Sequence, residues 1–196
     1  MKTLCLGGSF NPIHHGHLIC ARAAAEARGF ERVLLIPSGQ PPHKPDDPEL
    51  AAPEHRLRMC QLAASATASF DVADLELFRS GPSLTIDTAQ ELRRLQGFDA
   101  VHWLIGADML NLLPKWHRPL ELMKQVEFII MARPGVTIDW SQLPPEYQHL
   151  RSNIVAVPQI DISATELRRR IRANLPIDFL APPSVVDYIR NNHLYR

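Results

Sequence analysis

The sequence predicts an α/β fold in which a doubly wound, mostly parallel sheet carries helices on both faces. Short apolar runs typical of strands alternate along the 196 residues with segments of helical periodicity. The apolar runs are continuous rather than alternating, which is typical of parallel strands covered on both faces. A chain of this length suits one α/β domain, so we expect a single domain over residues 1–196.

Strands are expected where apolar runs are bounded by turn residues, at 2–6, 32–37, 70–73, 101–106, 126–132 and 153–157. The run at 126–132 stops at Arg133-Pro134-Gly135, a sequence that ends regular structure. Trp103 lies inside the apolar run 101–106, and we expect its side chain in the core.

Helices are expected at 21–26, 53–65, 85–95, 107–113, 163–173 and 184–191. Pro53 stands at the start of the second, a position at which proline suits a helix. Ser163 with Glu166 three residues later has the pattern of a capping box at the start of the fifth.

The composition restricts the possible partners. Lysine plus arginine and aspartate plus glutamate both number 21, so the net charge is zero. Broad binding of nucleic acid needs many unneutralised basic groups, and we expect no nucleic-acid partner. Cys5, Cys20 and Cys60 are far apart and form no C-x-x-C pair, which is typical of reduced, partly buried thiols in a cytoplasmic protein.

No membrane segment is expected. The apolar run 126–132 contains Glu127 and is too short to span a bilayer. The apolar start of the chain ends at Gly7, too early for the apolar region of a signal peptide. We therefore expect a cytoplasmic protein without a membrane partner.

The segment 7–17, Gly-Gly-Ser-Phe-Asn-Pro-Ile-His-His-Gly-His, is the most informative part of the sequence. It joins the first expected strand to the first expected helix. Small residues let an anion approach the backbone, and a helix N-terminus offers N–H groups and the positive end of a dipole. His14 and His17 flank Gly16 there and add hydrogen-bond donors. The segment therefore indicates a phosphate site for a nucleotide.

Other interpretations of these histidines are weaker. The glycines at 7, 8 and 16 do not fit a G-x-G-x-x-G fingerprint, and no Gly-Lys-Ser/Thr of a P-loop follows. A metal pair needs further ligands, and no nearby cysteine or carboxylate supplies one, so we expect no metal site. A polar loop with surface histidines is the remaining alternative. Two histidines beside a glycine-rich turn favour phosphate contact over it.

Further polar motifs follow the carboxyl ends of expected strands, where parallel sheets bind ligands. Lys44, after the second strand, is either a solvated lysine or a mobile charge for phosphate. Thr165 and Arg168 are three residues apart near a helix start and so share a face. Their hydroxyl and guanidinium, with backbone N–H groups, suit a terminal phosphate. We expect the other arginines of this helix to be solvated, namely Arg169, Arg170 and Arg172.

Two residues each keep two interpretations. Asp108, which follows the fourth strand in Gly106-Ala107-Asp108, suits ribose hydroxyls and equally suits a helix N-cap. Trp116 lies in a loop and is either a core anchor or an aromatic face for a planar ring.

No Ser-His-Asp order, carboxylate pair or general base stands out in the sequence. Nucleotidyl transfer to an ionised phosphate needs no proton abstraction, so catalysis depends on alignment and charge neutralisation. The residues that we expect to carry it are His14, His17, Lys44 and Arg168.

With these residues established, the chain resembles the bacterial nicotinate-nucleotide adenylyltransferases of the HxGH nucleotidyltransferase superfamily. The resemblance rests on GGSFNPIHHGH, PSGQPPHK, SGPSLTIDT at 80–88, WLIGADMLNLLPKW at 103–116, ARPG at 132–135 and ISATELR at 162–168. It implies a Rossmann-like nucleotidyltransferase fold in which a C-terminal helical part, 159–196, completes the ATP site. The implied reaction joins ATP and nicotinate mononucleotide into deamido-NAD and pyrophosphate, with Mg²⁺ carried by ATP.

The resemblance also implies individual roles. The residues expected to contact ATP are Gly8, Ser9, Phe10, His14, Gly16, His17, Gly106, Arg133, Ile162, Ser163, Thr165 and Arg168. The residues expected to contact the mononucleotide are Asn11, Lys44, Thr85, Asp108, Trp116 and His117. Among these, Trp116 stacks on the nicotinate ring, Asp108 binds ribose, and backbone N–H groups near Thr85 and His117 receive the carboxylate.

The chain departs from the pattern of the family at four positions. Ser9 and Asn11 replace the usual Thr and Asp, and Asn11 keeps hydrogen bonding while it removes a charge. Ala164 replaces a serine and removes one phosphate contact. Leu84 replaces a common tyrosine and bears on the choice between the acid and the amide of the mononucleotide.

Two rival functions are weighed against this one. The first is a sister adenylyltransferase for nicotinamide mononucleotide or phosphopantetheine, and Trp116 with the segment 80–88 argues against phosphopantetheine. The second is a nucleotide-binding regulator without turnover, and the intact set of His14, His17, Lys44 and Arg168 argues against it. A monomer and a homo-oligomer fit the sequence equally.

Overall fold

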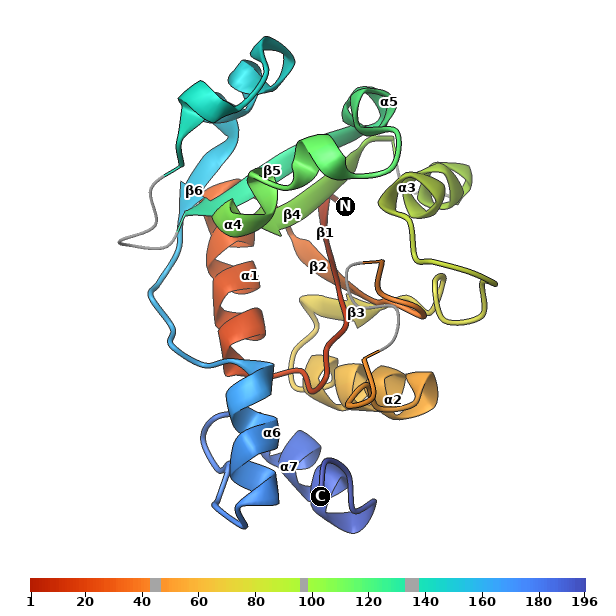
Figure 1. Cartoon of the computed structure of the whole chain (residues 1–196), viewed down its shortest axis with the longest axis vertical. Helices are drawn as coiled ribbons and strands as arrows, with labels where there is room; N and C mark the ends of the chain where they lie inside the picture. The colour runs from red at the N-terminus through yellow and green to blue at the C-terminus, as the bar shows by residue number, and fades with distance from the viewer. Residues whose placement is uncertain (43–46, 96–98, 133–137) are drawn as a thin grey trace. The chain divides into compact units, whose positions relative to one another are not determined.

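A computed structural model describes residues 1–42, 47–95, 99–132 and 138–196 of the chain. All six expected strands form in it, namely β1 Thr3–Gly8, β2 Arg32–Pro37, β3 Phe70–Val72, β4 Val101–Gly106, β5 Val126–Ala132 and β6 Ile154–Ala156. They make one sheet in the order β3-β2-β1-β4-β5-β6 (Figure 1). The order reverses between β1 and β4, which is the defining feature of a doubly wound sheet. The predicted fold class is confirmed.

The central strands pair in parallel and in register. Leu4 of β1 lies opposite His102 of β4, Trp103 opposite Phe128 of β5, and Ile130 opposite Ile154 of β6. Most side chains of β4 and β5 are buried, and Glu127 is the exposed one among them. Continuous burial explains why these strands read as unbroken apolar runs in the sequence.

The helices are α1 His15–Ala27, α2 Pro53–Ala64, α3 Thr85–Arg94, α4 Ala107–Leu110, α5 Pro119–Gln125, α6 Ala164–Arg172 and α7 Pro183–Asn191. The described residues also form three 3₁₀ helices, namely η1 Leu113–Lys115, η2 Trp140–Gln142 and η3 Pro145–Asn153. In the part of the chain that the structure describes, no helix is long and apolar enough to cross a membrane.

Two helix boundaries differ from expectation by more than one residue. The first helix begins at His15 rather than at residue 21, because the His14 carbonyl already accepts from the backbone N–H groups of His17 and Leu18. The helix expected over 107–113 ends at Leu110 and is followed by η1. Pro114 explains the break, because a proline has no N–H to donate to the carbonyl four residues earlier, here Leu110, and its ring clashes with that carbonyl in an α-helix. The short α5, which begins at a proline, was not predicted.

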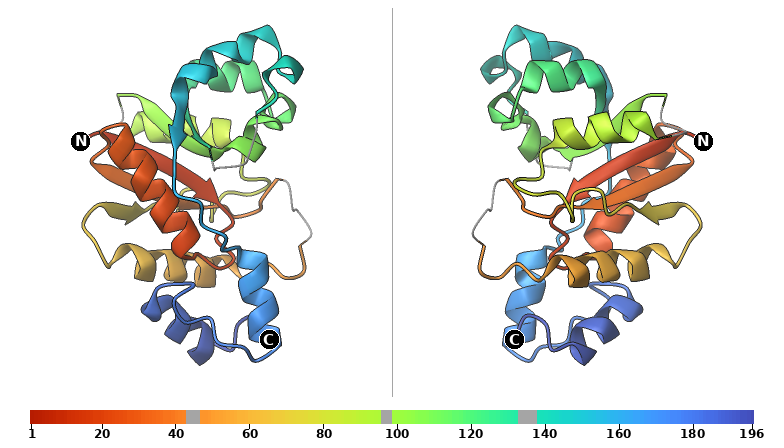
Figure 2. Two further views of the ribbon diagram at one scale, coloured as in Figure 1. Left: turned by 90° about the vertical axis from the view of Figure 1, so that its left-hand side faces the viewer. Right: turned by 90° about the vertical axis from the view of Figure 1, so that its right-hand side faces the viewer.

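The chain divides into two compact units. The first unit comprises Met1–Gly7, Cys20–Val33 and Leu84–Gln159, and the second comprises Gly8–Ile19, Leu34–Ser83 and Ile160–Arg196. In the first unit, α1 lies on one face of the sheet and α3 on the other (Figure 2). Trp103 is 3% exposed, as expected for a core residue. Gly7 packs against it so closely that a Cβ would lie 2.6 Å from the indole ring.

In the second unit, α2 packs against β3 and α7 (Figure 1). Its buried face carries Met59, Cys60 and Ala63, and α7 contributes Val185 and Ile189. These positions follow the spacing of one face of an amphipathic helix.

The thiols give a direct test of this packing. None of the three cysteines is in a disulfide bond, and all three are buried, more completely than the sequence indicated. Burial raises the pKa of Cys5 to about 12 and also raises the pKa of Cys60, which suppresses the reactive thiolate. We expect a disulfide reagent at pH 8 to modify none of the three in the native protein and all three in guanidinium. A thiol that reacts equally fast in both states would contradict the buried arrangement.

Candidate functional site

The paired histidines lie at the N-terminus of α1. His14 immediately precedes the helix, and its carbonyl accepts from the backbone N–H of His17 at 3.0 Å. The two imidazoles stack, with centroids 3.7 Å apart and planes 30° from parallel. His14 is 5% exposed and His17 is half-buried. The structure thus brings together the two histidines that the motif singles out.

A hydrogen bond determines the tautomer of His17, that is, which ring nitrogen carries the proton. The backbone N–H of His14 donates to His17 Nδ1 at 3.3 Å. A ring nitrogen that accepts carries no proton, so the ring proton of His17 is on Nε2, which is then a donor. Donors at a helix N-terminus, together with the helix dipole, favour an anion at this point.

Gly16 allows the segment before α6 to approach this pair. A Cβ on Gly16 would lie 3.0 Å from the His14 ring and 3.2 Å from the carbonyl oxygen of Ile162. A larger residue would force these groups apart. The structure therefore brings together Gly16 and Ile162, two residues that the resemblance assigns to the ATP site.

The loop between β1 and α1 is shaped by Phe10. This residue is 1% exposed and has a φ of 45°, an uncommon conformation for a residue other than glycine. Its ring meets the His17 ring edge to face, with centroids 5.2 Å apart. The buried Phe10 side chain thus packs against the His17 side of the histidine pair. The neighbouring Gly8 carbonyl accepts from the Ser38 backbone N–H at 2.9 Å, which joins this loop to the end of β2.

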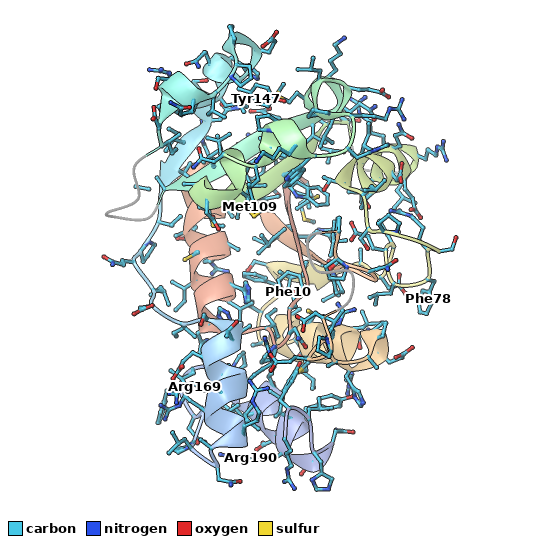
Figure 3. All side chains as sticks on the ribbon, in the orientation of Figure 1. Phe10, Phe78, Met109, Tyr147, Arg169 and Arg190 are labelled. Atoms are coloured by element: carbon cyan, nitrogen blue, oxygen red, sulfur yellow. The ribbon has the colours of Figure 1, made fainter. Side chains whose placement is uncertain are left out.

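Half of the expected capping box forms at α6. The Ser163 hydroxyl accepts from the Glu166 backbone N–H at 3.2 Å. The Glu166 carboxylate does not return to the Ser163 backbone, because it pairs with Arg169 at 2.7 Å on the outer face of the helix (Figure 3). A two-pronged arginine contact outcompetes one backbone N–H group. Ser163 and Thr165 are exposed at this helix start, where the sequence expects a phosphate.

Arg168 lies in a network that the sequence did not predict. Its side chain is 5% exposed, and its Nε and Nη2 donate to Glu49 Oε2 at 3.0 and 2.7 Å. Its Nη1 donates to the Asn11 carbonyl at 2.9 Å. Arg172 reaches the other Glu49 oxygen, so it is paired rather than simply solvated. The hydrogen bonds from Arg168 and then from Arg172 lower the pKa of Glu49.

The same network explains the asparagine that departs from the pattern of the family. Asn11 is buried, its Nδ2 donates to the Glu49 carbonyl at 2.9 Å, and its Oδ1 accepts from the Ala51 backbone N–H at 3.0 Å. An aspartate would accept the second hydrogen bond and could not donate the first. The amide therefore attaches the segment 49–51 to residues 9–14, the loop between β1 and α1, which we call the histidine loop. The expected contact of Asn11 with the mononucleotide stays a prediction.

In the first unit, the structure decides between the two interpretations of Asp108 only in part. The residue before α4 is Gly106, and no side chain caps that helix, so the N-cap interpretation is wrong. Asp108 is exposed in the first turn, and its carboxylate folds back over Gly106 so closely that a Cβ there would clash. An exposed carboxylate at the end of β4 keeps the ribose interpretation open.

Trp116 is anchored against the sheet, and its role as an aromatic face for a planar ring stays a prediction. It directly follows η1, and its ring meets Phe128 of β5 edge to face at a centroid distance of 6.1 Å. The side chain is nevertheless only half-buried, so part of the indole is accessible. His117 beside it is exposed, and Thr85 is the first residue of α3. A ring anchored at one edge offers a fixed apolar surface.

Two expected site residues, Lys44 and Arg133, lie outside the described residues. Within the described ranges, no group of three or more histidine, cysteine, aspartate or glutamate residues is placed to hold a metal ion.

Sequence reasoning missed Glu49 and Arg56. Arg56 is fully buried on the apolar face of α2, one turn before Met59 and Cys60. A charged residue at a core position of an amphipathic helix is a signal that could have identified it. Glu49 lies in a loop and no pattern distinguishes it.

Comparison with known proteins adds a family to this geometry. Residues 5–170 match the family described as cytidylyltransferase-like. A probable nicotinate-nucleotide adenylyltransferase of Opitutus terrae is 40% identical over 196 residues, which cover 100% of this chain and 98% of the relative. One of Oceanobacillus iheyensis is 40% identical over 190 residues, which cover 97% and 94%.

Solved structures agree with the fold. The Plasmodium falciparum nicotinic acid mononucleotide adenylyltransferase complexed with NaAD has a TM-score of 0.77 at 22% identity, over 100% of this chain and 98% of that one. The same protein complexed with APC has a TM-score of 0.75 at 21% identity, with the same coverage. At such identities the likeness concerns the arrangement of the backbone.

Proposed function

We infer the reaction of this chain from its family: it belongs to the nicotinate-nucleotide adenylyltransferases, within the cytidylyltransferase-like proteins. It transfers the adenylyl group of ATP to nicotinate mononucleotide and releases deamido-NAD and pyrophosphate. Two of these relatives match over 100% of this chain and over 98% and 99% of their own lengths.

The chemistry needs alignment more than proton transfer. A phosphate oxygen of the mononucleotide attacks the α-phosphorus of ATP, and the bond from that phosphorus to the pyrophosphate oxygen breaks. The leaving pyrophosphate takes the electron pair. Because the attacking phosphate is already ionised, no base has to remove a proton from it. The enzyme contributes positioning and positive charge.

The stacked histidines carry the proposal. We place the ATP phosphates at His14 and His17, because His17 Nε2 is a donor and both rings lie at the N-terminus of α1. Negative charge grows on the pyrophosphate as the bond breaks, and a fixed donor stabilises it without reorganisation. We also assign ATP contacts to residues beside these histidines, namely Gly8, Ser9 and Phe10 before α1 and Gly16 in its first turn.

The start of α6 supplies the second phosphate contact. Ser163 and Thr165 present hydroxyls beside its backbone N–H groups, and we assign the β- and γ-phosphates to them. Arg168 contributes a buried positive charge while it fixes Asn11 and Glu49. Mg²⁺ enters with ATP as part of the substrate, held by phosphate oxygens and water.

We assign the mononucleotide to residues of the first unit. The accessible part of Trp116 suits the nicotinate ring, and the Asp108 carboxylate suits ribose hydroxyls. The backbone N–H groups near Thr85 and His117 suit the carboxylate of the acid.

The assay that tests the reaction is pyrophosphate release with MgATP, in parallel with nicotinate mononucleotide, its amide and phosphopantetheine. We expect the acid to be strongly preferred. Preference for the amide would move the function to the sister branch and implicate Leu84. No release with any acceptor would favour the nucleotide-binding regulator.

Replacing Trp116 with alanine tests the stacking role. We expect KM for the mononucleotide to rise by about tenfold, which corresponds to an aromatic contact of about 1.5 kcal/mol, while KM for ATP stays nearly unchanged. Initial rates over both substrate concentrations measure the two constants. Trp140→Ala is the matched control, because Trp140 is also half-buried but packs against Arg151. An effect confined to ATP would reject the stacking role.

A further inference from the structure

Arg56 is a buried cation that the reaction as described does not use. It lies in the first turn of α2 and has no exposed surface. Burial lowers the pKa of its guanidinium, but arginine starts so far above neutral pH that the group remains a cation. Such a residue is costly to bury, so its partners indicate why it is there.

Among the residues that the structure describes, all its hydrogen-bond acceptors are backbone carbonyl oxygens. Nη1 donates to Ser9 at 2.9 Å and to Ser38 at 2.5 Å, and Nη2 donates to Gly39 at 3.0 Å. Nε donates to Ala51 at 2.9 Å. One guanidinium thus joins three segments, of which one is the histidine loop.

The bond to Ser9 has a consequence for the next residue. In a trans peptide the carbonyl and the following N–H point in opposite directions. A Ser9 carbonyl fixed on Arg56 therefore fixes the orientation of the peptide that enters Phe10. Phe10 has a φ of 45°, a conformation that costs free energy and persists only when its surroundings impose it.

Phe10 in turn contacts the histidine pair. Its buried ring meets the His17 ring edge to face at 75° and 5.2 Å. On its other side, His17 stacks on His14 and accepts the His14 backbone N–H. The position of the Phe10 ring therefore limits the orientations that the His17 ring can adopt.

We propose that Arg56 is a positioning residue for His17: through the Ser9 carbonyl it sets the Phe10 turn, and through the Phe10 ring it sets the direction of His17 Nε2. This rests on the proposed role of His17 in adenylyl transfer. Arg56 touches no substrate in this scheme. It acts through the backbone of the loop that the substrate contacts.

The main test is Arg56→Lys, which keeps the charge and loses the planar fork that spans Ser9, Ser38 and Gly39. We expect a folded protein whose kcat falls about 100-fold, the effect of a displacement of about 1 Å at the chemistry, with KM for the mononucleotide nearly unchanged. The matched control is Arg58→Lys, two residues further along α2 and exposed. We expect wild-type kinetics from it.

A second readout does not depend on turnover. Nitrogen-15 spectra of the histidine rings report the tautomer of His17 in the free protein, with the His17→Ala spectrum for assignment. We expect one tautomer in the wild type and a mixture in Arg56→Lys. If the wild type has no adenylyltransferase activity, this measurement still decides the positioning role. An unchanged His17 spectrum together with unchanged kcat in a folded Arg56→Lys would overturn the proposal.

Phe10→Leu tests the route and also serves if Arg56→Lys does not fold. It leaves the Arg56 contacts in place and removes only the aromatic ring between them and His17. We expect the same loss of kcat and the same mixture of tautomers. If Arg56 acts through Phe10, the double variant loses no more than the worse single variant. Additive losses, or a Phe10→Leu protein with the wild-type spectrum, would contradict the route.

Discussion

Replacing His17 with alanine is expected to lower kcat about 1,000-fold, the cost of removing one preorganised donor from a developing negative charge. KM for nicotinate mononucleotide is expected to change little. The hydrogen bond from the His14 backbone leaves the proton on Nε2. In the proposed mechanism this donor acts on charge that grows only as the pyrophosphate leaves, so we expect its loss to affect the transition state more than the bound substrates.

His15→Ala is the matched control for this experiment. His15 is adjacent in the same segment, is half-buried, and takes part through its backbone N–H, which donates to the Leu180 carbonyl. The substitution leaves that bond intact, so we expect kcat close to that of the wild type. Thermal melting of both variants shows whether the fold is kept. An unchanged kcat in a folded His17→Ala protein would remove His17 from the mechanism.

The fold could be predicted because burial on both faces leaves a simple signature. The strands β4 and β5 appear in the sequence as apolar runs, and their predicted bounds are the observed ones. The start of α1 was placed six residues late, because Gly16 and the histidines suggest a loop. In the structure the His14 carbonyl begins the helix, so His17 belongs to its first turn.

The site could be predicted where chemistry and spacing coincide. His14, Gly16, His17 and Ile162 are together, as the motifs indicated. What sequence could not give are the contacts made by residues distant along the chain. Arg168 meets Glu49, which is 119 residues away, and no local pattern encodes such a pair.

The second large effect concerns that pair. Replacing Arg168 with alanine is expected to lower kcat/KM for ATP about 100-fold or more, because a buried, charge-assisted donor near a polyanion is lost. It also leaves the buried Asn11 carbonyl without its donor, which costs about 1–3 kcal/mol of unfolding free energy. Steady-state kinetics and denaturant unfolding measure the two losses. The matched control, Arg172→Ala, removes the other arginine on Glu49 but leaves Asn11 untouched, and we expect from it only a small loss of either quantity.

Glu49→Gln separates the two roles that we assign to Arg168, which are to hold Asn11 and its loop and to contact the phosphates of ATP. The pKa of Glu49 is lowered by Arg168 and Arg172, so its carboxylate is charged throughout the pH range of the assay. In the free protein this carboxylate is paired with the guanidinium of Arg168, which we expect to attract the polyphosphate of ATP. Removing its charge leaves an amide oxygen for Arg168 and reduces repulsion of the incoming anion, so we expect KM for ATP to fall. If Glu49→Gln instead weakens ATP as much as Arg168→Ala does, the pair serves only to fix Asn11 and its loop. The contact with phosphate would then belong to the histidines and to the start of α6 alone.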